Sequence, residues 1–261
     1  MKELIFYRRL IRINLLSALE YKGWWMMVLQ VLLTVAADPV GTVLLFSRFG
    51  SIGVWSMERI LLVYSLSVTS YGLAEGFLRG FDYFPWHILR TGNFDRLMLR
   101  PRSLFTQVAA HFFHIHRFAR PAAGLAVIFW CLARQSAALG PRNVLLLVSA
   151  LAGGALIYTG IFLLSSGIAF YSIRVLDFFN LTFAGHQVSR IPVDHMPRLL
   201  RGMFTFLLPM LVVSYYPASV LCGWGEALWK GLLALPVGAL FFGLSLLVWR
   251  GGVRHYQSTG S

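Results

Sequence analysis

Charged residues are scarce in this chain of 261 residues. Asp, Glu, Lys and Arg together make up 13% of it, about half the share that is typical of soluble domains, whereas hydrophobic residues make up 57%. So few charges cannot cover the surface of a soluble protein of this length, and the mean hydropathy of +0.68 indicates that most of the outside faces lipid. The same composition excludes intrinsic disorder, a coiled coil and a secreted disulfide scaffold.

Cysteine is nearly absent, and no Cys/His metal-binding pattern is present. Cys131 and Cys222 both lie in apolar stretches and are interpreted as small buried hydrophobic residues. His111 and His114 would share one face of a helix, but His116 would point away from them. These histidines are therefore interpreted as interfacial residues, and no metal site is predicted.

Motifs of membrane-embedded enzymes and of nucleotide-binding proteins are missing as well. The chain contains no H-E-x-x-H, so zinc-dependent intramembrane proteolysis lacks its ligands, and no G-x-x-x-x-G-K-[ST], so the chain itself has no phosphate-binding loop. Ser166, near His186, lacks the turn that usually presents a nucleophilic serine. We predict no catalytic residue and no cofactor on this chain.

Acidic residues are outnumbered by basic ones, 10 to 23. Such an excess can indicate a nucleic-acid partner. No basic run is interleaved with base-stacking aromatic residues outside the apolar stretches, so we expect no nucleic-acid binding. In a membrane protein, the same excess usually collects in the cytoplasmic loops.

Long apolar stretches of the length that a bilayer requires, about 20 residues, occur six times. They are continuously apolar and do not alternate, which favours helices over a barrel. The sequence therefore predicts an all-α membrane protein with a single transmembrane domain over residues 23–249. The predicted spans are residues 24–46, 57–78, 118–138, 143–166, 201–222 and 231–249.

The distribution of basic residues predicts the orientation. With six spans, 18 of the 23 basic residues lie on one side of the membrane, together with both termini. The positive-inside rule makes that side cytoplasmic, so we expect an inner-membrane protein whose tail, residues 250–261, is cytoplasmic. Residues 1–22 carry Arg8, Arg9 and Arg12 between apolar residues at helical spacing, which predicts an amphipathic elbow helix on the inner leaflet.

Three glycines and a carboxylate stand out in the second predicted span. Gly72, Gly76 and Gly80 are spaced four apart and form a smooth stripe, which favours close helix packing over a substrate path. Glu75 precedes Arg79 by four residues, so an ion pair is the plain interpretation. A carboxylate in a membrane is also a candidate for a transport pathway.

Three further residues are candidates for a pathway. Asp38 precedes Pro39, and it either caps the outer half of a broken helix or lines a cavity. Tyr215 and Tyr216 precede Pro217 near the outer end of the fifth predicted span. We expect a short re-entrant or surface helix here that closes the outer mouth, and an ordinary aromatic-belt loop is the alternative.

The most specific pattern follows the second predicted span, at residues 92–101. Gly92 breaks the chain, Asp95 can cap a helix and Pro101 ends it, so a short amphipathic element is expected. Its apolar and basic side chains predict a cytoplasmic protein-docking surface, and a loop that rests on lipid headgroups is the alternative. These side chains are Leu97, Met98 and Leu99, with Arg96 and Arg100 beside them.

The string Gly-x-Phe-Asp-x-Leu-x-Leu-Arg-Pro at residues 92–101 resembles the loop signature of the ABC-2 type transporter permeases, a family of six-helix subunits of about this length. Ile191 and Pro192, leading to Pro197, are similar to the family's second inner segment. Pro209, followed by Tyr-Tyr-Pro-Ala at residues 215–218, is similar to its outer segment. The segment at residues 188–190 departs from the family's pattern, which leaves the role of the 174–201 loop open.

The resemblance implies one membrane half of an ATP-binding-cassette exporter. It would pair with a second permease, of the same or a sister chain, and two separate ATPase chains would bind ATP and Mg²⁺. Substrate identity does not follow from the sequence. The residues implied at the ATPase-coupling loop are Phe94, Asp95, Arg96, Leu97, Leu99 and Arg100.

The main alternative is a secondary transporter or channel that works without an ATPase. It would need paired polar residues at mid-membrane depth, for which Asp38 and Glu75 are the candidates. A membrane-embedded enzyme is the less favoured alternative.

Overall fold

The computed structural model describes residues 2–20, 22–50, 55–134, 140–172, 197–224 and 227–257. This part of the chain is helical and contains no β-strand. Four of its helical segments are long and apolar enough to cross a membrane, and a bent pair adds a fifth if it counts as one span. The four segments are Trp24–Arg48, Met57–Leu89, Pro141–Ala169 and Leu228–His255.

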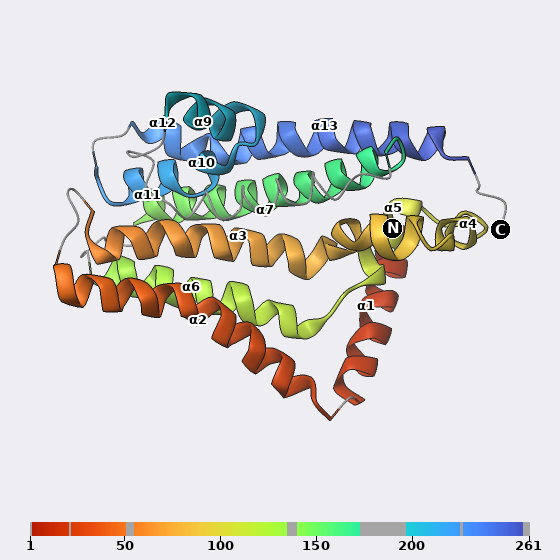
Figure 1. The fold of residues 1–261 in the computed structure, drawn as a ribbon, viewed down its shortest axis with the longest axis horizontal. Helices are drawn as coiled ribbons and strands as arrows, with labels where there is room; N and C mark the ends of the chain where they lie inside the picture. Colours follow the sequence, from red (N-terminus) through yellow and green to blue (C-terminus); the bar gives the residue numbers. More distant parts are fainter. Residues whose placement is uncertain are drawn as a thin grey trace.

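The body of the molecule is a set of long helices that lie roughly parallel (Figure 1). Helix α7 (Pro141–Ala169) lies between α3 (Met57–Phe84) and α13 (Ala234–His255). Gly153 of α7 faces Gly238 of α13 so closely that a Cβ on either glycine would overlap backbone atoms of the other helix. Small residues thus bring these two backbones together, as is common between membrane helices.

Helix α6 (Ala119–Arg134) packs against both α2 (Trp24–Phe49) and α3. It has 16 residues, fewer than the approximately 20 that usually cross a bilayer. Residues 135–138 of the predicted span 118–138 lie outside the described residues.

Helix α2 is continuous through Pro39. The predicted break of the helix at this proline is therefore wrong, and Asp38 does not cap a second half of it. A helix tolerates proline when the neighbouring backbone groups find other partners. Asp38 lies on the exposed surface of α2.

The predicted span 201–222 is broken into short pieces. Helices α9 (Arg198–Gly202) and η4 (Met203–Leu207) form one arm, and α10 (Met210–Val213) and α11 (Tyr215–Leu221) form the other, bent by 72°. Pro209 sits at the bend, where it has no N–H to continue the helix. A separate short helix does form at Tyr215–Leu221, followed by α12 (Leu228–Leu232) and α13. The predicted loop 174–201 lies almost wholly outside the described residues.

Helix α1 (Lys2–Glu20) crosses one end of the bundle (Figure 1). The Tyr7 hydroxyl donates a hydrogen bond of 2.8 Å to the Phe77 carbonyl, and the Asn14 amide donates one of 2.8 Å to the Ala110 carbonyl. Burial raises the pKa of Tyr7 to about 12, so this phenol remains a protonated donor. The predicted amphipathic segment is thus hydrogen-bonded to the rest of the protein. Its arginines, Arg8, Arg9 and Arg12, are exposed.

Candidate functional site

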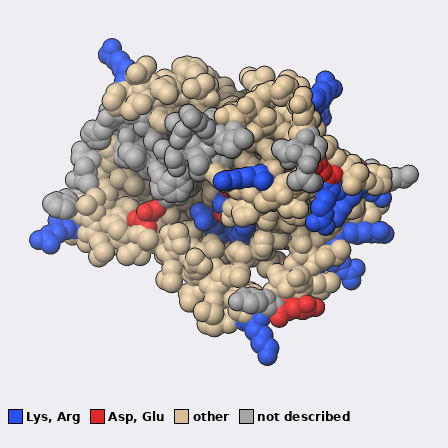
Figure 2. Space-filling model, turned by 45° about the vertical axis from the view of Figure 1, so that its right-hand side comes forward, with Lys and Arg blue, Asp and Glu red and all other residues tan. Residues whose placement is uncertain are grey.

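The segment between α3 and α6 forms a compact cap at one end of the bundle. It consists of η1 (Pro85–Leu89), α4 (Asn93–Met98), α5 (Leu104–His111) and η2 (Ile115–Phe118). The first turn of α1 and the last turn of α13 lie at this same end (Figure 1). Lys and Arg side chains gather toward this side of the molecule (Figure 2).

Helix α4 begins at Gly92, whose φ of 70° lies in the left-handed region that favours glycine. No side chain caps the helix, so the prediction that Asp95 caps it is wrong. Asp95 is the third residue of the helix, one turn beyond the cap position. Its carboxylate hydrogen-bonds with Tyr256, and burial together with this carboxylate raises the pKa of the Tyr256 phenol.

The inner face of α4 is held by an aromatic cluster. The ring of Phe94 is fully buried and lies edge-on to Phe84 at 5.3 Å, Phe170 at 5.4 Å and Tyr256 at 4.9 Å between centroids. These three partners stand at the end of α3 and just after the ends of α7 and α13. We call these four residues the Phe94 cluster. It joins α4 to three long helices at once.

Leu97 belongs to the same buried face, since only 5% of it is exposed. The expectation that Leu97 contributes to a docking surface is therefore wrong, because residues 94 and 97 are one turn apart and point together into the core.

The outer face of α4 is open. Leu99, just after the helix, is 84% exposed, and Met98 is partly exposed beside it. Arg96 and Arg100 are both exposed. An apolar side chain that protrudes between two arginines is typical of a surface that another protein covers.

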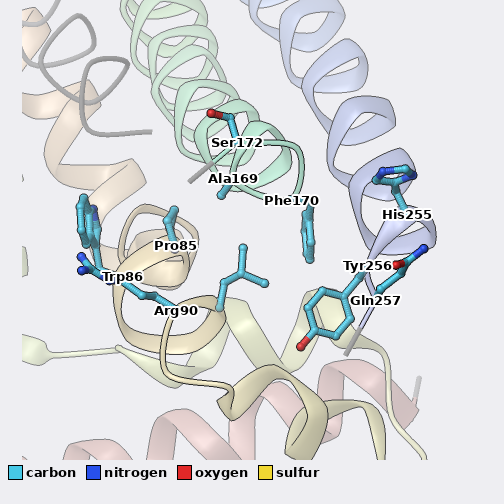
Figure 3. A pocket seen from close by; sticks show the side chains of 10 residues that line it. Pro85, Trp86, Arg90, Ala169, Phe170, Ser172, His255, Tyr256 and Gln257 are labelled. Atoms are coloured by element: carbon cyan, nitrogen blue, oxygen red, sulfur yellow. The ribbon is translucent and has the colours of Figure 1, made fainter. Parts of the chain in front are cut away.

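A pocket of about 410 Å³ lies beside the Phe94 cluster, between η1 and the ends of α7 and α13 (Figure 3). Trp86 and Arg90 stand on one side of it, with the guanidinium 5.4 Å from the centre of the indole ring. Phe170 and Tyr256 stand on the other side (Figure 3).

Glu75 lies in a buried ion cluster on the C-terminal half of α3. Its two carboxylate oxygens contact Arg79 Nη1 at 3.2 Å and Arg120 Nε at 3.1 Å. Arg79 Nε also contacts Asp82 at 3.0 Å. The predicted pair of Glu75 with Arg79 is confirmed. Arg120, on α6, was missed because its sequence position, 45 residues away, gives no local signal. We call these four residues the Glu75 ion cluster.

The three glycines of the stripe in α3 are in close contact with the segments that follow α3 in the chain. A Cβ on Gly72 would lie 2.6 Å from Pro121 Cδ, and one on Gly76 would lie 2.9 Å from the Phe118 ring. A Cβ on Gly80 would overlap the carbonyl of Val108 in α5. These three positions therefore seat the start of α6 and helix α5 directly against the α3 backbone.

The four candidate pathway residues are not brought together. Tyr215 and Tyr216 lie with their rings 5.5 Å apart, and Tyr215 contacts Trp55 just before α3. Glu75 lies 18 residues along α3 from its first residue, Met57. About 27 Å of helix therefore separates Glu75 from the end of α3 at which Tyr215 lies. Asp38 is exposed on α2.

Within the described ranges, no group of three or more His, Cys, Asp or Glu side chains is placed to hold a metal ion. His114 and His116 do approach each other, with 5.4 Å between ring centroids.

The comparisons with known proteins agree with this architecture. The model of a family described as ABC-2 family transporter protein matches residues 32–260, which is most of the chain and includes the whole cap. Searches of curated proteins and of solved structures return no match. The chain belongs to the ABC-2 transporter family and is a multi-pass membrane permease of an ABC-type transport system.

Proposed function

We propose that this protein is the permease subunit of an ABC exporter that is driven by separate ATPase chains through α4 and Leu99. Two ATPase chains would bind ATP and Mg²⁺, and a second permease, of the same or a sister chain, would complete the pore. The protein would lie in the inner membrane with both termini in the cytoplasm.

The observation that carries this proposal is the contrast between the two sides of the α4 segment, of which one is buried and the other is exposed. Phe94 and Leu97 fix the inner face in the core, whereas Leu99 protrudes between Arg96 and Arg100. A loop that only rested on the protein would not need a fully buried aromatic anchor. A part that transmits force needs both a contact surface and a rigid attachment, and this segment has both.

The Phe94 cluster gives the transmission a physical route. A push on α4 reaches the ends of α3, α7 and α13 through ring contacts of 4.9 to 5.4 Å. Packed side chains transmit displacement because they cannot be compressed much. ATP-driven closure of the ATPases would thereby shift the helices between two arrangements with different access to the substrate path.

The orientation is supported by the placement of the chain ends and of the basic residues. The cap, the start of α1 and the end of α13 share one end of the molecule (Figure 1). Basic residues gather toward that side (Figure 2), which the positive-inside rule assigns to the cytoplasm.

The alternative of an ATPase-independent transporter has less support. Glu75 is neutralised by two arginines and Asp38 is exposed on α2, so neither carboxylate stands in a polar cavity with the other. Ion-gradient-driven transport by the purified chain without any ATPase would favour this alternative.

Replacing Leu99 with Asp is expected to weaken co-purification of the ATPase with the permease and to abolish substrate-stimulated ATP hydrolysis by the complex. Burying a carboxylate in an apolar contact costs several kcal/mol, so the affinity should fall at least about a hundredfold. Because Leu99 is 84% exposed, the permease itself should fold and insert normally.

Leu99→Met is the matched control, because it keeps an apolar side chain of similar size at the same position. It should bind and stimulate the ATPase nearly as the natural chain does. Equal behaviour of Leu99→Asp and Leu99→Met would show that Leu99 is not at the ATPase contact.

A further inference from the structure

A second pocket, of about 580 Å³, is lined by different residues from the pocket in Figure 3. It is formed between the beginning of α5 and the last turns of α13. None of its lining residues is acidic. They are Ser103, Leu104, Phe105, Phe242, Leu246, Trp249, Arg250, Val253 and Arg254.

The walls of this pocket are apolar. Leu104 and Phe105 come from α5, and Phe242, Leu246 and Val253 come from α13. All five are only partly buried, so they present hydrocarbon surface to whatever occupies the space. A wall of this kind at the end of a membrane helix suits an acyl chain better than a hydrated ion.

The rim of the pocket is cationic. Arg250 and Arg254 are one helical turn apart, so they share a face of α13, and both are exposed. None of the ion pairs that the described residues form includes either arginine. Ser103 adds a hydroxyl from α5. Two guanidinium groups and a hydroxyl are donors suited to a phosphate group.

Trp249 supplies an independent sign that a polar ligand atom belongs here. The residue lines the pocket but is only 4% exposed, with its ring against Phe81 and Phe105. Its Nε1–H has no hydrogen-bond acceptor among the described residues. Buried polar groups are nearly always paired, so an oxygen atom of a ligand would satisfy a donor that the described residues leave open.

We propose that this pocket binds an anionic phospholipid of the inner leaflet. Arg250 and Arg254 hold the phosphate, Ser103 and Trp249 donate to headgroup or ester oxygens, and an acyl chain lies along Phe242 and Leu246. The apolar walls distinguish a lipid from a free phosphate ion, which would use the arginines alone. Basic pockets at the cytoplasmic side of membrane helices bind such headgroups in general. The inference rests on the proposed orientation of the chain, and it stands independently of the proposed coupling to an ATPase.

The test uses the purified full-length chain in an uncharged detergent. Short-chain phosphatidylglycerol, short-chain phosphatidylcholine and inorganic phosphate are each titrated, and bound adducts are counted by native mass spectrometry. Phosphatidylglycerol should bind most tightly. The double variant Arg250→Gln and Arg254→Gln should weaken its binding at least about tenfold, because charge-assisted hydrogen bonds to the phosphate are lost.

The double variant Arg96→Gln and Arg100→Gln is the matched control. It removes the same charge at the same spacing and at the same end, but neither residue lines this pocket. It should leave binding of phosphatidylglycerol within about twofold of the natural chain, since only diffuse attraction changes. Trp249→Phe keeps an aromatic side chain, although a smaller one, and removes the N–H donor, and it should also weaken phosphatidylglycerol binding.

Three results would overturn the proposal. One is equal binding of phosphatidylglycerol and phosphatidylcholine, which would show that the pocket does not select an anionic phospholipid. Another is binding of inorganic phosphate as tight as that of the lipid, which would assign the site to a free anion. The third is equal loss in both double variants, which would reduce the effect to overall charge.

Discussion

Replacing Glu75 with Gln is expected to lower the free energy of unfolding by about 3 kcal/mol or more, because it removes the one carboxylate that the described residues place against Arg120 and one of the two that they place against Arg79. Glu75 is 7% exposed and contacts both Arg79 and Arg120. The amide of Gln keeps the size of the side chain, so the loss is electrostatic rather than steric. The midpoint of thermal unfolding of the purified chain in detergent, followed by intrinsic Trp fluorescence, measures it.

Asp38→Asn is the control for this change. It removes one negative charge from another candidate membrane carboxylate, but Asp38 is exposed on α2. Its effect should stay within about 0.5 kcal/mol, as for other surface substitutions. A similar shift for both variants would show that the Glu75 ion cluster does not stabilise the junction of α3 with α6.

Replacing Gly80 with Ala is expected to displace α5 from α3 and to destabilise the protein by about 1–3 kcal/mol, as overpacking typically does. A Cβ at this position overlaps the Val108 carbonyl, and a backbone atom cannot move aside as a flexible side chain can. The steric cost works against the gain of up to about 1 kcal/mol that Ala brings to a helix interior. Because α5 follows α4, stimulation of ATP hydrolysis should fall together with the unfolding temperature.

Gly243→Ala provides the matched comparison. A Cβ at Gly243, also within a long helix, meets nothing within 4 Å. This variant should be neutral or slightly more stable, because only the helix propensity changes. A Gly80→Ala protein as stable as Gly243→Ala would contradict the close seating of α5 on α3.

Local sequence patterns were sufficient for the elements that depend on local physics. Continuous apolar runs predicted the long helices near 24–46, 57–78 and 143–166, and glycine, proline and arginine spacing predicted the short element at 92–101. The break in the fifth predicted span was not predicted, although Pro209 lies within that span. Helix α2 continues through Pro39, whereas the chain bends by 72° at Pro209, so proline in an apolar run does not by itself predict a break.

The two faces of α4 were beyond sequence reasoning for a related reason. Leu97 lies in α4 and Leu99 directly follows it, both are leucines, and hydrophobicity alone cannot tell a buried residue from an exposed one. The face of α4 that is buried is fixed by the contacts of Phe94 with Phe84, Phe170 and Tyr256, which come from three distant parts of the chain. Arg120 was missed as a partner of Glu75 for the same reason.

Site-specific crosslinking from position 99 tests the central claim most directly. In a chain with Cys131 and Cys222 replaced by Ala, Leu99→Cys would be treated with a short bifunctional thiol–amine reagent in native membranes. We predict a crosslinked product that contains an ATPase chain with a nucleotide-binding motif, and whose yield changes when ATP is added. Leu199→Cys, equally open but far from α4 along the molecule (Figure 1), should give no such product. Absence of an ATPase from the product at position 99, or equal yield at position 199, would contradict the account.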